Sequence, residues 1–277
     1  MELLRSRQSR KPRLASTHCS IKTILCVGLF YSLAGLIFAD RAFAAAVIPT
    51  GYSVHQSVDV DPTEAGIAGS LQILQDRRIT PTLRKLMWGI SNEPDFVLSE
   101  DDVRQKQFAV EPLRHAHLRL VDLSGRVTVD EQFDVPLAEI KVAHLYGTSF
   151  PTYLVTLDYS IGMGSYAGPT TTFAEIRNGH LAFVHASETG GTRDTQLSLM
   201  RSLKADWRIV RGDKGNLNEI LSVACRPDFR DPNRDDFIII YSTFRFDGMR
   251  WHLSLRQQVG FWENEGENSW PDRGNFP

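Results

Sequence analysis

The fold prediction for this 277-residue chain starts from residues 171–185, TTFAEIRNGHLAFVH. Two runs rich in β-branched and aromatic residues flank Asn178-Gly179, and an Asn-Gly pair between such runs is a strong signal of a β-hairpin. Both residues accept the positive φ values that a two-residue hairpin turn requires. The stretch therefore predicts strands from Thr171 to Arg177 and from His180 to His185, joined by a tight turn.

The same pattern occurs on both sides of this hairpin. Two further pairs of runs flank a glycine turn, namely His117–Asp122 with Arg126–Phe133 around Leu123-Ser124-Gly125, and Phe237–Phe246 with Arg250–Leu255 around Asp247-Gly248. Tyr153–Tyr159 is a dense run of Leu, Val, Thr and Tyr, which is typical of a strand. We therefore expect a mainly antiparallel sheet over about 114–262.

Helix signals precede this sheet. Asp61 and Pro62 form an N-cap and a first helical residue, and apolar residues follow at spacings of four and three, at Ile67, Leu71 and Leu74. The pattern predicts a helix over about Pro62–Asp76. Thr80-Pro81 and Ser99-Glu100-Asp101-Asp102 predict two more helix starts, so that the helical part would span about 61–110. The expected fold class is α+β, with short N-terminal helices before the antiparallel sheet.

The first 44 residues have the order of a secretory signal peptide. Five basic residues between Arg5 and Arg13 precede the apolar run Ile24–Ala39, and Ala42-Phe43-Ala44 supplies a small-x-small cleavage site. The apolar run has 16 residues, or about 24 Å of helix, which is short for a hydrocarbon core of about 30 Å. Residues 1–44 are therefore predicted to be cleaved, which makes the protein periplasmic or secreted, with no stable membrane insertion afterwards. The alternative is an uncleaved anchor whose basic end stays in the cytoplasm.

The rest of the chain, 45–277, is expected to form a single domain that ends in a polar tail, 263–277. Without residues 1–44 it has 24 basic and 31 acidic residues, a net charge of −7. This charge argues against nucleic acid or anionic lipid as a partner, because both favour a basic surface. Cys225 is the one cysteine left, so no intramolecular disulfide is expected, and a buried apolar role is the simplest interpretation. Pairing of Cys225 between chains and the oligomeric state stay open.

Two strand-rich stretches resemble one another. Glu139-Ile140, a strand from Tyr153 and the Asn178-Gly179 turn parallel Glu219-Ile220, a strand from Phe237 and the Asp247-Gly248 turn. Chance similarity between antiparallel hairpins is the preferred explanation, because two units are too few to close a propeller. A duplicated sheet unit is the alternative.

The glycine-rich loop Gly162–Pro169 is the main candidate for ligand contact. It is followed by a strand and not by a helix, which excludes a Rossmann or Walker phosphate site. Its serine directly follows a glycine, which excludes a nucleophile elbow. Three glycines indicate special φ values or a close backbone approach. We expect this loop and the strand before it to supply the ligand-binding residues Asp158, Tyr159, Ser165 and Tyr166.

Two weaker patterns concern metals. Asp231, Asn233 and Asp235 place oxygens at alternate positions, as calcium loops do, although the EF-hand glycine and glutamate are missing and a solvated turn explains the same residues. No other cofactor is indicated. His115 and His117 would share one face of a strand, which suits zinc, but no third ligand can be chosen from the sequence.

The sequence shows no resemblance to a known family, and no catalytic residue can be assigned. Candidate acids and histidines for an enzyme are scattered through the strand region, at Asp158, His144, Glu175, His185 and Glu188. Aromatic residues gather near the C-terminus, where core packing is preferred over a carbohydrate or peptide platform. The expected function is that of an exported binding protein, with an envelope protein or a glycan as partner. The alternative is a secreted hydrolase with a site near the 158–169 loop.

Overall fold

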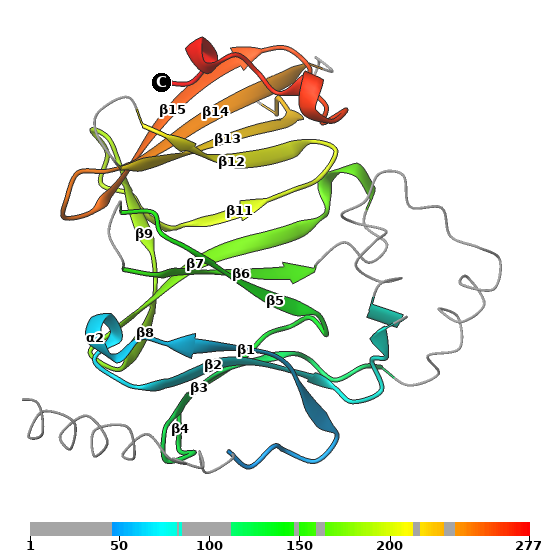
Figure 1. Cartoon of the computed structure of the whole chain (residues 1–277). Coiled ribbons are helices and arrows are strands. Elements are labelled where there is room, and N and C mark those ends of the chain that lie inside the picture. Colours follow the sequence, from blue (N-terminus) through cyan, green and yellow to red (C-terminus); the bar gives the residue numbers. More distant parts are fainter. Residues whose placement is uncertain are drawn as a thin grey trace, which may run out of the picture. The chain divides into compact units, whose positions relative to one another are not determined.

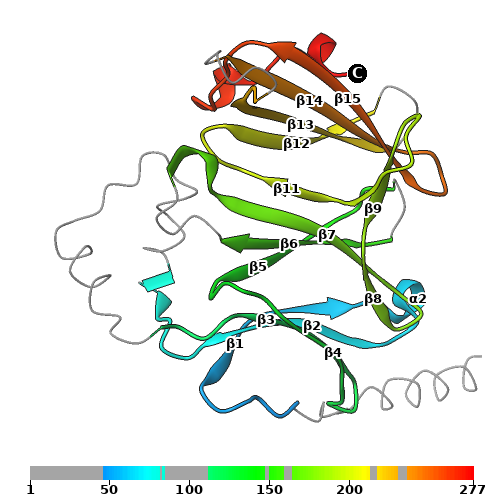
Figure 2. The same cartoon turned by 180° about the vertical axis from the view of Figure 1, so that it is seen from behind.

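The computed structural model describes residues 46–81, 83–84, 112–146, 150–158, 164–212, 217–229 and 236–277. All of them belong to one compact unit, Phe43–Pro277. Strands dominate this unit, and they form three sheets that are antiparallel except for one strand pair (Figures 1 and 2).

Each sheet contains a meander of four consecutive strands. The first sheet has the order β1 (Tyr52–Val60), β2 (Gly69–Asp76), β3 (His117–Asp122) and β4 (Val127–Gln132). The second meander comprises β5 (Ala138–Ala143), β6 (Thr152–Asp158), β7 (Pro169–Arg177) and β8 (His180–Phe183). The third comprises β12 (Ala205–Arg211), β13 (Asn218–Pro227), β14 (Phe237–Phe246) and β15 (Trp251–Val259).

The three predicted glycine hairpins are confirmed, and each joins the third and fourth strands of its meander. Gly125, Gly179 and Gly248 have φ values of 82°, 75° and 102°, a region that favours glycine. In the first and third meanders an aspartate completes the turn, because Asp122 and Asp247 accept hydrogen bonds from backbone N–H groups two to four residues ahead.

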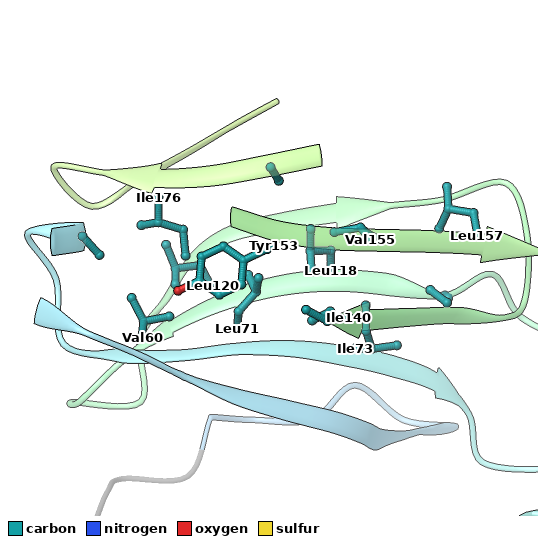
Figure 3. Close-up of a cluster of buried hydrophobic side chains, with 14 of the residues drawn as sticks. Val60, Leu71, Ile73, Leu118, Leu120, Ile140, Tyr153, Val155, Leu157 and Ile176 are labelled. Atoms are coloured by element: carbon teal, nitrogen blue, oxygen red, sulfur yellow. The ribbon is translucent and has the colours of Figure 1, made fainter. Parts of the chain in front are cut away.

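The second sheet is buried on both faces. Along β6, Tyr153 and Val155 pack against the first sheet, and Leu154 between them packs against the third. Figure 3 shows the cluster between the first two sheets, where side chains such as Leu71 and Leu118 meet the second-sheet residues. On the opposite face, Leu154 belongs to a cluster built from residues of the second and third sheets, including Phe173, Trp207, Ile220, Phe244 and Trp251. The alternation of side chains along a strand makes this double burial possible.

A long hairpin ties the second sheet to the third. After β8 the chain passes Val184 and continues as β9 (His185–Glu188), which pairs with β15 in the third sheet. It returns through β10 (Asp194–Gln196) and Leu197 to β11 (Ser198–Met200), which pairs with β7. Val184 and Leu197 are buried where the strands change sheet, and Leu197 donates its N–H to the Val184 carbonyl at 2.7 Å.

The C-terminal segment covers the other face of the third sheet. Phe276 is buried, stacks on Trp270 at 5.6 Å between ring centroids, and meets Tyr241 edge-on at 5.3 Å. Trp262 packs against the same cluster. Core packing, the preferred interpretation of the C-terminal aromatics, is thus confirmed for most of them, although Phe261 is 56% exposed.

The predicted N-terminal helices, and with them the α+β fold class, are wrong in the described residues. Asp61 does cap a helix, but this helix, α2 (Pro62–Ala65), has four residues and ends at Gly66, which is left-handed with φ 69°. The chain then enters β2, where Leu71 and Ile73 point into the core while Gln72 does not. The described residues contain no helix of seven residues or more, and none long and apolar enough to cross a membrane.

The failure has a physical reason. The spacing of Ile67, Leu71 and Leu74 suits a helix, but Leu71 and Ile73 also satisfy the two-residue period of a strand, and pairing of β2 with both β1 and β3 stabilises the strand. At the second predicted start, Arg84 N–H donates to the Thr80 carbonyl, as in a helical turn. The rest of that helix and the third predicted helix lie outside the described residues.

The similarity between the two strand-rich stretches does not hold strand for strand. The matched pairs Glu139-Ile140 and Glu219-Ile220 lie on β5 and β13. β5 is the first strand of the second meander, whereas β13 is the second strand of the third meander. The recurring element is instead the four-strand meander. Cys225 is buried and free, and no disulfide occurs among the described residues, as the cysteine count predicts.

The strand assignment of β2 can be tested by a pair of alanine variants. Ile73 is fully buried, so Ile73→Ala should lower the free energy of unfolding by about 2–5 kcal/mol. Gln72→Ala should change it by about 0.5 kcal/mol or less, because this side chain lies outside the core. Urea unfolding measures both. Near-equal small losses would contradict the strand, since the predicted helical stripe of Ile67, Leu71 and Leu74 leaves Ile73 off the buried face.

Candidate functional site

A pocket of about 260 Å³ lies at the boundary between the second and third sheets. Its lining comes from three strands of the second sheet, from Arg201 in the loop between β11 and β12, and from Trp207 on β12. The second-sheet residues that contribute are Glu139, Lys141, Leu154, Thr156, Pro169 and Thr171.

The floor of the pocket is a polar row across three paired strands. Glu139 on β5 lies opposite Thr156 on β6, which lies opposite Thr171 on β7. The two threonine hydroxyls are 2.8 Å apart and share a hydrogen bond. The next row on the same face contains Leu154 and Phe173, which belong to the apolar cluster with the third sheet. The pocket therefore begins where the contact between these sheets changes from apolar to polar.

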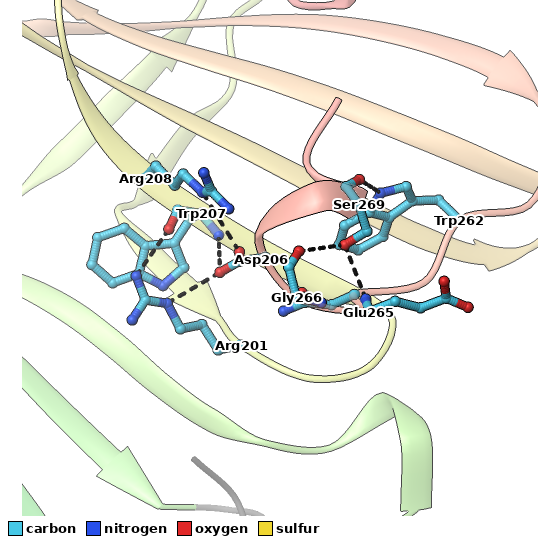
Figure 4. Close-up of polar contacts among 9 residues, drawn as sticks. Arg201, Asp206, Trp207, Arg208, Trp262, Glu265, Gly266 and Ser269 are labelled. Carbon is cyan, nitrogen blue, oxygen red and sulfur yellow. Dashed lines mark hydrogen bonds and ion pairs between the residues drawn. The ribbon is translucent and has the colours of Figure 1, made fainter. Parts of the chain in front are cut away.

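The opposite wall is a cation held over an indole ring. The Arg201 guanidinium lies 4.6 Å from the centroid of Trp207 and donates to the Trp207 carbonyl at 3.0 Å. The carboxylate of Asp206, which is buried, lies 3.1 Å from Arg201 Nε and accepts the Trp207 N–H at 2.8 Å (Figure 4). This fixed arrangement pre-orients the guanidinium, which reduces the entropy lost when a ligand binds.

A buried arginine, Arg84, holds the pocket residue Glu139. Arg84 donates to Glu139 at 3.2 Å, to the Ala138 carbonyl at 2.8 Å and to Gln75 at 2.9 Å. Burial lowers the pKa of Arg84, and the Glu139 and Asp158 carboxylates offset part of that shift. Glu139 is thereby fixed at the pocket edge as an oriented acceptor.

The first sheet holds β5, the strand that carries Glu139 and Lys141. β5 is an edge strand, and Gln56 on β1 satisfies the outward backbone groups of Ile140, donating to its carbonyl at 2.6 Å and accepting its N–H at 2.8 Å. The preceding residue, His55, lies in a β-bulge. Burial and then the Arg84 charge lower the pKa of His55, and the Glu139 charge opposes this shift.

The structure places the predicted glycine loop beside this pocket. Gly168 is buried against the Arg201 backbone, and a Cβ at this position would lie 1.7 Å from the Arg201 carbonyl oxygen. The close backbone approach expected of these glycines therefore occurs at Gly168. Ser165 and Tyr166 lie in a short 3₁₀ turn, and Tyr166 is 44% exposed.

The remaining predicted ligand residues are divided between the pocket edge and the undescribed part of the chain. Asp158 is fully buried at the end of β6, opposite Pro169, which lines the pocket. Tyr159 lies outside the described residues, as does the whole candidate calcium triad of Asp231, Asn233 and Asp235.

The histidine pair of the zinc hypothesis has other partners. Both ring nitrogens of His117 are engaged, with Asp130 at 2.8 Å and Tyr52 at 3.2 Å. His115 is exposed, and the described residues contain no group of three or more metal-ligating side chains.

Among the scattered enzyme candidates, Asp158 lies at the pocket edge, and none of them is a described lining residue. Glu175 is buried, bonds to the Tyr146 hydroxyl and to Arg177, and burial raises its pKa. Trp251 donates to the same Tyr146 hydroxyl at 3.0 Å, so this group joins the core between the second and third sheets. It is a buried polar network that fixes side chains, distinct from the pocket.

Sequence reasoning missed most of the lining. The missed residues come from four separate segments. Strand pairing brings Lys141, Thr156 and Thr171 together, and Arg201 and Trp207 join them where the third sheet packs on the second. One signal was present, because Thr156 interrupts an otherwise apolar strand at a position that alternation places on the same face as Leu154.

Comparison with known proteins identifies no relative, since no protein-family model matches the chain and no curated protein or solved structure matches it significantly.

Substitution of Gly168 tests the contact that positions Arg201. Gly168→Ala should destabilise the protein by about 1–3 kcal/mol, because the added methyl group overlaps backbone atoms that cannot rotate away. Gly274→Ala is the matched control, since its Cβ would meet no atom within 4 Å. Thermal unfolding of both variants measures the difference. Equal melting temperatures would show that the loop and Arg201 do not touch.

The bulged histidine predicts a pH effect on stability. Because the folded state lowers the pKa of His55, it binds this proton less readily than the unfolded chain does, whose histidine pKa is about 6.5. The wild type should therefore lose stability relative to His55→Gln as the pH falls from about 7.5 to about 5.5. Urea unfolding at both pH values measures this, with exposed His180→Gln as the control. If wild type and His55→Gln lose the same free energy of unfolding between the two pH values, the lowered pKa of His55 is wrong.

Proposed function

We propose that this chain is an exported binding protein and that the pocket between β7 and β12 binds a glycan that carries an acidic sugar. Export rests on the basic, apolar and small-x-small order of residues 1–44. The ligand class rests on the composition of the pocket.

The observation that carries the proposal is the mixture of groups on one small surface. Two threonine hydroxyls and the Glu139 carboxylate suit the hydroxyl groups of a sugar, which both donate and accept hydrogen bonds. Lys141 and Arg201 suit a carboxylate, because both carry fixed positive charge. Arg201 is shared with Asp206, whereas Lys141 makes no ion pair within the described part of the chain.

Trp207 adds a second reason. Its indole N–H is buried and has no acceptor among the described residues, a condition that costs free energy in the ligand-free protein. Because this nitrogen has almost no accessible surface, a ligand oxygen would supply the missing acceptor only after a small shift of the ring.

The alternative is a secreted hydrolase at the same place, near the 158–169 loop. Glu139 favours it, because it is the one carboxylate among the described lining residues. Its pairing with Arg84 favours binding over catalysis, since a general acid or base needs a proton that exchanges with the substrate.

Binding can be measured by calorimetry with uronic acid oligomers, using neutral hexose oligomers of the same length as the comparison. We expect the acidic oligomer to bind, and Lys141→Gln to weaken binding at least about tenfold. The double variant Thr156→Val, Thr171→Val removes both hydroxyls but keeps the shape of the side chains, and it should weaken binding of the acidic oligomer. Arg193→Gln, at an exposed position, is the control.

Analysis of the oligomer after incubation separates the two functions. An intact oligomer supports a binding protein, and shortening that is lost in Glu139→Gln supports the hydrolase. No binding of either oligomer, or equal binding by wild type and Lys141→Gln, would refute the glycan proposal.

A further inference from the structure

A second, larger pocket is lined by arginines. It has a volume of about 390 Å³, and the described residues around it are Arg77, Arg78, Pro112 and Arg114. Arg77 and Arg78 directly follow β2, and Arg114 lies just before β3, so the antiparallel pairing of these strands brings the arginines together. The chain as a whole has a formal net charge of −2, so this positive charge is a local concentration.

One buried carboxylate organises the pocket. Asp76 is fully buried and accepts the side chain of Arg78 through both oxygens, at 3.0 and 3.1 Å from Nε. It also accepts the backbone N–H of Arg114 at 2.9 Å. Arg78 in addition donates to the Pro112 carbonyl at 2.9 Å, which ties both strand ends to one acid. Among the described residues Asp76 pairs with the side chain of Arg78 alone, so the positive charges of Arg77 and Arg114 are not neutralised by it.

The guanidinium of Arg114 occupies a place that only glycine leaves open. A Cβ on Gly51 would lie 1.5 Å from a terminal nitrogen of Arg114, and Gly51 has a φ of 89°. The guanidinium also lies 5.8 Å from the centroid of the Tyr52 ring. His117 meets this ring edge-on and bonds to its hydroxyl, so the ring is held in place.

Two of the three arginines have unused donors. Within the described residues, the side chains of Arg77 and Arg114 make no hydrogen bond and no ion pair, and both are exposed. Each guanidinium presents a planar set of donors that matches two oxygens of a tetrahedral oxyanion.

We infer that this arginine pocket binds a phosphate group. Arg77 and Arg114 would donate to its oxygens, while Arg78, neutralised by Asp76, fixes the distance between them. The site is separate from the glycan pocket, and it takes a ligand of higher charge density. Free phosphate and the phosphomonoester of a lipid headgroup present the same oxygens to these donors.

Calorimetry with inorganic phosphate tests the inference, with sodium chloride of matched ionic strength as the blank. We expect saturable binding that weakens at least about tenfold in the Arg77→Gln, Arg114→Gln double variant. The control is Arg193→Gln with Arg226→Gln, which removes the same charge from two exposed arginines elsewhere. Absence of binding to wild type, or an equal loss in the control, would overturn the site.

A second variant separates geometry from charge. Gly51→Ala removes no arginine but displaces the Arg114 guanidinium, so phosphate binding should again weaken in the folded variant. Unchanged affinity would overturn the role of Arg114. Vesicles of phosphatidylcholine with and without phosphatidic acid identify the source: tighter binding to the acidic vesicles than to inorganic phosphate assigns a lipid headgroup, and weaker binding assigns a soluble phosphate. The glycan assay is independent, because none of these variants touches the other pocket.

Discussion

Burial of both faces of the second sheet is the constraint on which the rest of the structure depends. Tyr153 and Val155 pack on one neighbour and Leu154 on the other, so each sheet presents an apolar surface to the middle one. A sheet that is covered on both faces cannot shift its register by one residue without exchanging the two sets of side chains. This register also fixes which face of the second sheet carries the polar row of Glu139, Thr156 and Thr171.

The candidate glycan pocket follows from the same constraint. The face of the second sheet that meets the third sheet is apolar at Leu154 and Phe173 and polar one row further on, where the two hydroxyls need hydrogen-bonding partners. The two hydroxyls bond each other, so full coverage of that row by apolar side chains would leave one hydroxyl proton without an acceptor. Trp207 on β12 and Arg201 cover the row only in part, and they leave a cavity with polar walls.

Local sequence signals are sufficient to predict the hairpins. The structure of β2 and the lining of the pocket depend on contacts between distant segments, which the sequence does not show. Gly125, Gly179 and Gly248 specify their turns through backbone conformation alone, so a short window of sequence is sufficient. The helix predicted over Pro62–Asp76 is wrong because its cap is real but its continuation depends on β1 and β3, and β3 lies about fifty residues away in the chain. The predicted glycine loop does lie at the edge of the site, because Gly168 contacts the backbone of the lining residue Arg201. No local sequence signal indicates that Lys141 and Trp207 line the same pocket.

The two pockets use one device, a buried aspartate that orients an arginine near it in the chain. Asp206 holds Arg201 over Trp207, and Asp76 holds Arg78 against Pro112. A buried carboxylate is costly to desolvate, and here backbone N–H groups and guanidinium donors together satisfy it. The difference lies in what remains unpaired. In the first pocket, the lining cation that makes no ion pair among the described residues is Lys141, which lies next to hydroxyls and a carboxylate, and this suits a sugar acid. Beside Asp76 the free cations are two guanidinium groups with no hydroxyl or carboxylate among the described lining residues, which suits a compact dianion.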